Sequence, residues 1–220
     1  MPPCPGGERA EGKEQRTVRS IDSELKAYIE QNILPLYEAH DRAHGPEHVQ
    51  VVLENSFALL DGLDVEPNMV YTVAAYHDVG IRISREEHEA VSGQWLWEDK
   101  NLERWFTPQQ RQIMREAVED HRASRQEPPR NIYGRIVSEA DRDLNPERVV
   151  RRMIEYSKAH WPQWSDEEHI QRTIAHVKDK YSESGYLHLW LPCPRNEAGL
   201  ATLREWLRTG ELAERCKKHL

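Results

Sequence analysis

The sequence has no long hydrophobic run and few cysteines. No stretch of the 220 residues approaches the roughly 18 consecutive apolar residues that a membrane-spanning helix requires. The first seven residues, MPPCPGG, contain no apolar segment of the kind found in a secretory signal peptide. Cys4, Cys193 and Cys216 form no Cys-x-x-Cys pair, which argues against a disulfide framework or a thiolate zinc site. These absences predict a cytoplasmic protein with reduced thiols and no membrane partner.

Basic residues are in the minority. The chain carries 30 Lys and Arg against 38 Asp and Glu, a formal net charge of −8. Because proteins that bind long nucleic acids usually carry a basic surplus, such a partner is not expected. A small phosphorylated ligand remains compatible with this charge, since one pocket needs only a few local cations. Apolar residues make up 38% of the chain and the mean hydropathy is −0.85, which predicts a packed core beneath a well-solvated surface.

Apolar residues recur at helical spacing along most of the chain, so we predict an all-α fold. Strand-like alternation occurs only over residues 186–191, within an expected loop at 182–196. Residues 1–17 are rich in Gly, Pro and charge and are expected to form a disordered leader. Residues 18–160 are expected to form a helical core, and residues 161–220 C-terminal helices packed on it. The expected helices are 21–37, 46–60, 67–79, 84–99, one starting at 107, 132–144, 146–157, 166–181 and 197–217.

Five of these helices carry a histidine or an aspartate on the face that bears their apolar residues. These residues are His48, His77, His88, His121 and Asp141. A single buried histidine is ordinarily a core residue that hydrogen-bonds a backbone carbonyl. Five such groups buried together would repel one another when charged and would leave lone pairs unpaired when neutral. A divalent cation removes both penalties, and the pattern therefore predicts a metal site.

Asp78 follows His77 directly and strengthens this prediction. It falls in the last turn of the expected helix that stops at Gly80, where the helix dipole disfavours a negative charge by ~0.3–1 kcal/mol. Local rules broken without local compensation tend to mark functional sites. A carboxylate at this position could bridge two metal ions. The pair His77-Asp78 is therefore the predicted centre of the site.

Three short strings extend the pattern to a known family. They are AHGPEHV at 43–49, AAYHDVG at 74–80 and EADRDL at 139–144. Their order, His then His-Asp then Asp, resembles the signature of the HD-domain superfamily of metal-dependent phosphohydrolases. The resemblance covers about residues 35–150 and implies an HD-type helical bundle with additional C-terminal helices. The GYP motif of the superfamily's cyclic-dinucleotide phosphodiesterases is absent.

The resemblance also implies a ligand set. His48, His77, Asp78 and Asp141 would hold a first ion, and Asp78, His88 and His121 a second, with His77 and Asp78 as the catalytic pair. A site of imidazoles and carboxylates without thiolates suits Fe, Mn, Co, Ni or Zn, as one or two ions per chain. Arg82, Arg125 and Arg142 are candidates for binding a substrate phosphate. For each of them a solvated surface arginine is the alternative.

The resulting functional hypothesis is a phosphohydrolase that uses metal-activated water. Its substrate would be a small phosphorylated molecule, in the first instance a nucleotide, cleaved as a phosphomonoester, phosphodiester or pyrophosphate. The same ligand order also resembles the HD-type mixed-valent di-iron oxygenases, which cleave C–C or C–P bonds. A third alternative is a non-catalytic metal-binding regulatory module, which predicts missing ligands; none is missing here.

Overall fold

The computed structural model describes residues 20–41, 44–122 and 125–220, and these residues form helices and loops without a β-strand. The predicted all-α class is confirmed. The expected leader, residues 1–17, lies outside the described residues. None of the helices in the described part combines the length and apolar character needed to cross a membrane. The elements in chain order are α1 (Ser23–Asn32), η1 (Leu34–Ala39), α2 (Pro46–Ala58), α3 (Pro67–Tyr76), η2 (Val79–Arg82), α4 (His88–Glu98), η3 (Lys100–Arg104), α5 (Pro108–Glu119), α6 (Ile132–Asp141), α7 (Pro146–His160), α8 (Asp166–Tyr181), α9 (Pro194–Thr209) and α10 (Glu211–Lys217).

Local sequence signals set several helix ends. The side chain of Thr107 accepts a hydrogen bond from the Gln110 backbone, and the Gln110 side chain accepts one from the Thr107 backbone, a capping box that starts α5. Ser165 and Glu168 start α8 in the same way. Gly210 adopts φ 79°, a left-handed conformation that suits glycine, and it divides α9 from α10. The single helix expected over 197–217 is therefore two helices.

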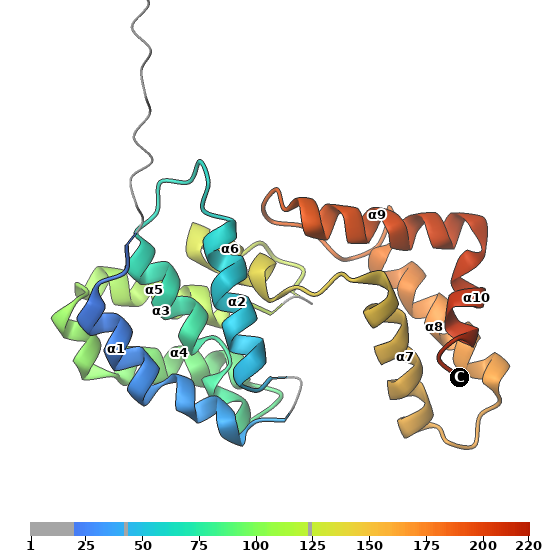
Figure 1. The fold of residues 1–220 in the computed structure, drawn as a ribbon, viewed down its shortest axis with the longest axis horizontal. Helices are drawn as coiled ribbons and strands as arrows, with labels where there is room; N and C mark the ends of the chain where they lie inside the picture. The colour runs from blue at the N-terminus through green and yellow to red at the C-terminus, as the bar shows by residue number, and fades with distance from the viewer. Residues whose placement is uncertain (1–19, 42–43, 123–124) are drawn as a thin grey trace, which may run out of the picture.

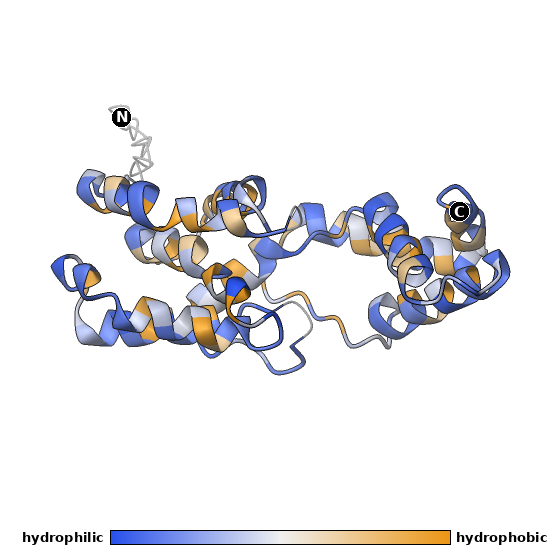
Figure 2. Ribbon diagram, turned by 90° about the horizontal axis from the view of Figure 1, so that it is seen from below, coloured by the Kyte–Doolittle hydropathy of each residue, from blue (hydrophilic) through white to orange (hydrophobic). Residues whose placement is uncertain are grey.

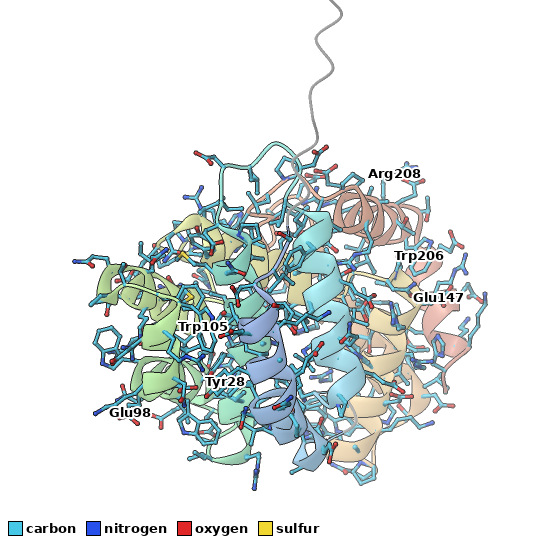
Figure 3. All side chains as sticks on the ribbon, turned by 60° about the vertical axis from the view of Figure 1, so that its left-hand side comes forward. Tyr28, Glu98, Trp105, Glu147, Trp206 and Arg208 are labelled. Carbon is cyan, nitrogen blue, oxygen red and sulfur yellow. The ribbon has the colours of Figure 1, made fainter. Side chains whose placement is uncertain are left out.

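The helices form two groups, α1–α6 and α7–α10 (Figure 1). The larger apolar cluster of the first group has contributions from each of α1–α6, and Tyr37, Leu96 and Met114 are completely buried in it. A smaller one consists of Leu60, Val70 and Ile136. Along the helices of both groups, hydrophobic positions interrupt hydrophilic ones, as expected of amphipathic helices (Figure 2). On one side of the first group, the ring of Tyr28 in α1 lies next to the ring of Trp105, which follows η3; their centroids are 5.7 Å apart (Figure 3).

The second group, α7–α10, has an apolar cluster of its own. It includes Val150 and Ile154 of α7 together with Leu203 and Trp206 of α9. The guanidinium of Arg215 lies 4.5 Å from the centroid of the Trp206 ring. We expected α7 to belong to the core of residues 18–160, but its apolar face packs against α8–α10 instead. The two packing groups therefore meet at residues 142–145 and not at residue 160.

Buried Glu139 of α6 joins the two groups. Its carboxylate accepts hydrogen bonds from the Trp190 backbone at 2.9 Å and from the Asn196 side chain at 2.7 Å. A Cβ atom on Gly199 of α9 would lie only 2.1 Å from the Leu144 carbonyl oxygen, so the backbones are in close contact there. These contacts fix α9 against the chain that leaves α6.

Candidate metal centre

The structure brings the six predicted ligands together from several helices, and most of them lie at helix ends. They are His48 in α2, His77 and Asp78 directly after α3, His88 at the start of α4, His121 just beyond α5 and Asp141 at the end of α6. His48, His88 and Asp141 lie within helices, as expected. His77 and His121, also expected within helices, are buried but lie just beyond α3 and α5, because these two helices end earlier than the periodicity indicated. Asp78 precedes η2 and does not lie in the last turn of α3.

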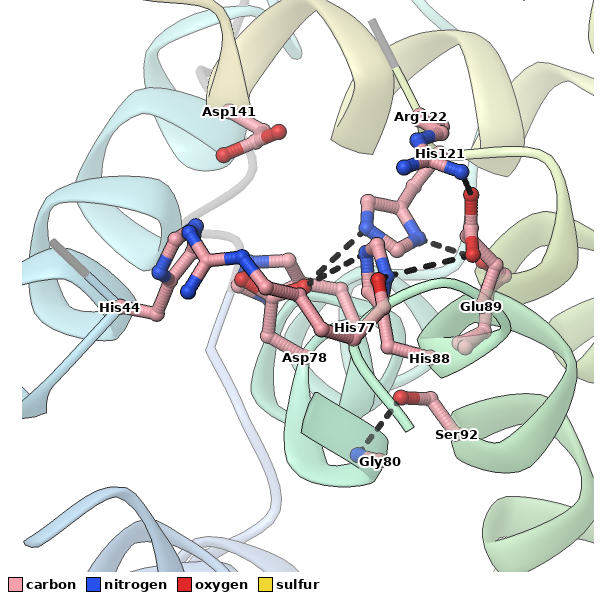
Figure 4. Close-up of polar contacts among 12 residues, drawn as sticks. His44, His77, Asp78, Gly80, His88, Glu89, Ser92, His121, Arg122 and Asp141 are labelled. Atoms are coloured by element: carbon pink, nitrogen blue, oxygen red, sulfur yellow. Dashed lines mark hydrogen bonds and ion pairs between the residues drawn. The ribbon is translucent and has the colours of Figure 1, made fainter. Parts of the chain in front are cut away.

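The two carboxylate oxygens of Asp78 face different histidines (Figure 4). Oδ2 lies 3.4 Å from His48 Nε2 and 3.3 Å from His77 Nε2. Oδ1 lies 3.3 Å from His88 Nε2 and 3.3 Å from His121 Nε2. One carboxylate is thus placed between two pairs of imidazole nitrogens, as a ligand shared by two cations would be.

Two groups of donor atoms are close enough to hold a metal ion. The first consists of His48, His77 and Asp78, and the second of Asp78, His88 and His121; within each, the donor atoms lie within 4.8 Å of one another. Asp141 reaches the first group through His48, because its Oδ1 lies 3.2 Å from His48 Nε2. The predicted metal-binding character of the cluster is supported.

The other ring nitrogen of three of these histidines is held by the backbone. In each case Nδ1 lies within hydrogen-bond distance of the carbonyl oxygen three residues earlier: His77 with Ala74 at 2.7 Å, His88 with Arg85 at 3.0 Å and His121 with Val118 at 2.6 Å. Because a carbonyl only accepts hydrogen bonds, Nδ1 carries the proton in the neutral ring. The lone pair of Nε2 is then directed at Asp78. Such backbone contacts orient histidine ligands in metal sites, so the residues present fit a metal ion.

Tyr37, which we did not identify from the sequence, positions the backbone of Asp78. Its hydroxyl accepts a hydrogen bond from the Asp78 backbone N–H at 3.2 Å and donates one to the Ala75 carbonyl at 3.0 Å. Tyr37 is completely buried. In the sequence it reads only as the last residue of an expected amphipathic helix.

Gly80 allows the start of α4 to approach Asp78. A Cβ atom here would lie 2.6 Å from the His88 carbonyl oxygen and 2.8 Å from the Ser92 backbone nitrogen. The Gly80 N–H donates to Ser92 Oγ at 2.9 Å (Figure 4). Only a residue without a side chain fits this contact, which brings His88 to the cluster. The sequence had indicated Gly80 only as a helix stop.

Neighbouring charges and hydrogen bonds shift the pKa values of the cluster. Burial would lower the pKa of His48, but its hydrogen bonds with Asp141 and Asp78 outweigh burial and raise the pKa to about 9. Burial would raise the pKa of Asp78, but the charge of His77 and the hydrogen bonds from neighbouring imidazoles hold it well below its ordinary value. The carboxylate is thus ionised and balanced by protonated imidazole, whose place a metal cation would take.

The cluster opens on one side to a cavity. His48 and Asp141 line a cavity of about 1080 Å³ that lies between α2 and α6 on one side and α7–α9 on the other. Their side chains are 18% and 21% exposed, whereas that of Asp78 is 4% exposed. A molecule in the cavity would therefore meet His48 and Asp141 before Asp78.

The structure separates the three arginines proposed for phosphate binding. Arg142 lines the cavity and is buried. Arg125 pairs with Asp120 at 3.1 Å and does not share a helix face with His121, because α5 ends at Glu119. Arg82 is exposed at the end of η2 and is not part of the cavity lining.

Glu89 is a further residue that sequence reasoning missed. Its Oε2 lies 3.2 Å from His88 Nδ1, and its Oε1 lies 2.9 Å from an Arg122 nitrogen (Figure 4). It thereby connects the start of α4 to the chain just after His121. In the sequence, only its position next to His88 indicated that Glu89 could belong to the site.

Comparison of the chain with protein-family models, with curated proteins and with solved structures found no match. The function is therefore inferred from the residues of the site themselves.

Proposed function

We propose that the chain is an HD-type metal-dependent phosphohydrolase that acts on a small phosphorylated molecule. The observation that supports this most directly is the placement of Asp78, whose two oxygens each face a pair of histidine Nε2 atoms at 3.3–3.4 Å. The order of these residues in the sequence agrees with the resemblance to the HD superfamily.

The donor set favours a transition metal. Four imidazole nitrogens and two carboxylates suit Fe, Mn, Co, Ni or Zn better than Mg or Ca, which prefer oxygen ligands. His48, His77, Asp78 and Asp141 would hold one ion, and Asp78, His88 and His121 a second.

Metal ions bound here would supply a nucleophilic water at neutral pH and stabilise charge on the phosphoryl oxygens. The chain's own residues prepare the site for this reaction. The backbone contacts at Nδ1 keep His77, His88 and His121 in one orientation. Tyr37 fixes the backbone of Asp78. His48 and Asp141, at the mouth of the cluster, are the ligands that a substrate phosphate would meet first.

The experiment is a phosphate-release assay on the metal-loaded protein against nucleotides and sugar phosphates. We expect release by the natural chain and a loss of at least about 100-fold in Asp78→Asn. Asp61→Asn, at an exposed position after α2, is the matched control and should retain full activity. Oxygen consumption without phosphate release would replace the proposal by the di-iron oxygenase. Neither activity, with metal bound, would indicate a regulatory module.

A further inference from the structure

The wall of the cavity opposite the metal centre is formed by two regular rows of side chains. Arg148, Arg152 and Tyr156 follow one another at intervals of four residues on α7, and all three line the cavity. Arg172, His176 and Lys180 do the same on α8. Residues four apart share one face of a helix, so each row turns a single face toward the cavity. The row on α8 spans about 12 Å.

The cavity is basic although the chain is acidic. Six of its lining residues are Arg or Lys and only three are Asp or Glu, in a chain whose net charge is −8. Arg148 and Arg152 share Asp143, at 3.2 and 3.7 Å. Three of the six, by contrast, have no carboxylate partner among the described residues. One of the three, Arg195, donates instead to the Asn55 and Asn196 side chains and to the Arg142 carbonyl. Among the described residues no carboxylate lies within 4.0 Å of the charged nitrogens of Arg172 or Lys180.

Arg172 and Lys180 contact aromatic rings instead. The Arg172 guanidinium lies 5.1 Å from the Tyr156 ring centroid and 4.8 Å from that of Trp161. Lys180 Nζ lies 5.3 Å from the ring centroid of Tyr181. These contacts hold the two side chains in place but leave their charges uncompensated by an anion.

Arg142 adds a buried cation to the same cavity. It is 3% exposed, and none of its three side-chain nitrogens donates a hydrogen bond within the described structure. Its nearest carboxylate is that of Glu139, at 3.5 Å, a distance that allows charge attraction without a good hydrogen bond. Arg142 and Lys180 line the same cavity, and burial together with the charge of Arg142 lowers the pKa of Lys180. Unsatisfied buried donors are unfavourable, and an anion between the two cations would offset this repulsion.

We propose that Arg142, Arg172 and Lys180, with His176, form a second anion subsite that binds a phosphate group of the substrate remote from the one at the metal centre. This inference rests on the proposed function and specifies its substrate class as a small molecule with at least two phosphate groups. Because His48 and Asp141 line the same cavity, one molecule can meet both the metal centre and the α8 row. The cavity volume of about 1080 Å³ fits a small molecule.

The test is binding by isothermal titration calorimetry on the purified full chain, at constant ionic strength, with free phosphate assayed before and after. Two pairs of probes each differ by one phosphate. Fructose 6-phosphate and fructose 1,6-bisphosphate test phosphates separated by a carbon skeleton, and AMP and ADP test adjacent phosphates. We expect at least tenfold tighter binding of the second member in one of the pairs, and that pair identifies the arrangement. Equal affinities within both pairs would overturn the proposal.

Three variants on α8 test the residues. Arg172→Gln and Lys180→Gln should each weaken binding of the favoured bisphosphate at least fivefold and that of the monophosphate less than twofold. Lys178→Gln removes the same charge at an exposed position outside the cavity lining and should change neither. Equal weakening in Lys178→Gln and Lys180→Gln, or no weakening in either, would contradict the subsite. The free-phosphate assay shows that the titration measures binding of the intact ligand. Absence of the subsite would therefore leave metal binding and phosphate release unchanged. Absence of phosphate release would likewise leave the tighter binding of the second probe unchanged.

Discussion

The backbone of Gly80 lies against that of His88 so closely that a Cβ atom on Gly80 would stand 2.6 Å from the His88 carbonyl oxygen. Gly80 follows Asp78 by two residues, and His88 begins α4. The contact therefore sets the distance between the shared carboxylate and a histidine of the second donor group. A backbone carbonyl cannot turn aside as the tip of a flexible side chain can, so any larger residue must displace α4.

Gly80→Ala should therefore damage the second donor group. We expect a loss of about 1–3 kcal/mol in the free energy of unfolding from overpacking, and less metal bound per chain. Urea unfolding and elemental analysis measure the two effects. Ser92→Ala removes the hydrogen bond from the Gly80 N–H without adding an atom, and should lower stability while retaining the metal. Full stability and full metal content in Gly80→Ala would show that the contact is unimportant.

Tyr37→Phe tests the hydrogen bond that positions Asp78. It leaves the Asp78 N–H and the Ala75 carbonyl without this buried partner, so stability should fall by about 1–3 kcal/mol. Metal affinity should fall roughly 10–100-fold, as for other residues that orient ligands. Tyr71→Phe is the matched control, because the Tyr71 hydroxyl is buried without a hydrogen-bond partner in the described structure. Equal effects of the two substitutions on metal affinity would contradict the role of Tyr37.

Alkaline pH should destabilise the fold through a pair of tyrosines. The hydroxyls of Tyr28 and Tyr76 both donate to Asp99 Oδ2 at 2.5 Å. Burial, with the hydrogen bond to Asp99, raises the pKa of Tyr28 from 10.0 to about 12 and raises that of Tyr76 as well. A folded-state pKa above the unfolded one means that the stabilisation is complete below about pH 10 and is lost as the pH rises toward 12.

Urea unfolding at pH 9 and pH 11 measures this loss. The decrease in unfolding free energy between the two values should be smaller in Tyr76→Phe than in the natural chain. Tyr156→Phe, at a side chain that is 49% exposed, should show the natural decrease. The same decrease in all three proteins would rule out Tyr76 as its source.

Much of the fold is predictable where local signals agree. The expected helix 166–181 coincides with α8, because the Ser165–Glu168 capping box and the apolar periodicity coincide. The placement of α7 was not predictable, because an amphipathic helix shows that one of its faces is buried but does not show against which neighbour. Gly210 could be seen in the sequence, but its left-handed conformation and the division of α9 from α10 depend on how both helices pack.

The candidate metal ligands were predictable from the chemistry of their side chains, but the residues that position them were not. Histidines and aspartates on otherwise apolar stripes stand out, so the residues of both donor groups could be named from the sequence. Tyr37 and Gly80 act through contacts with residues distant in the chain, which spacing does not reveal. The α8 row of Arg172, His176 and Lys180 reads in the sequence as an ordinary solvated face. The α8 row lies across a cavity from His48 only because the two helix groups pack next to one another.

The most direct test of the shared carboxylate is the metal content of purified chains by elemental analysis. We predict about two ions in the natural chain and about one in His88→Ala. Asp78→Asn should hold almost none, while Asp61→Asn should match the natural chain and circular dichroism should show all four proteins folded. Retention of the natural metal content by a folded Asp78→Asn would contradict the claim that Asp78 lies at the centre of a metal site.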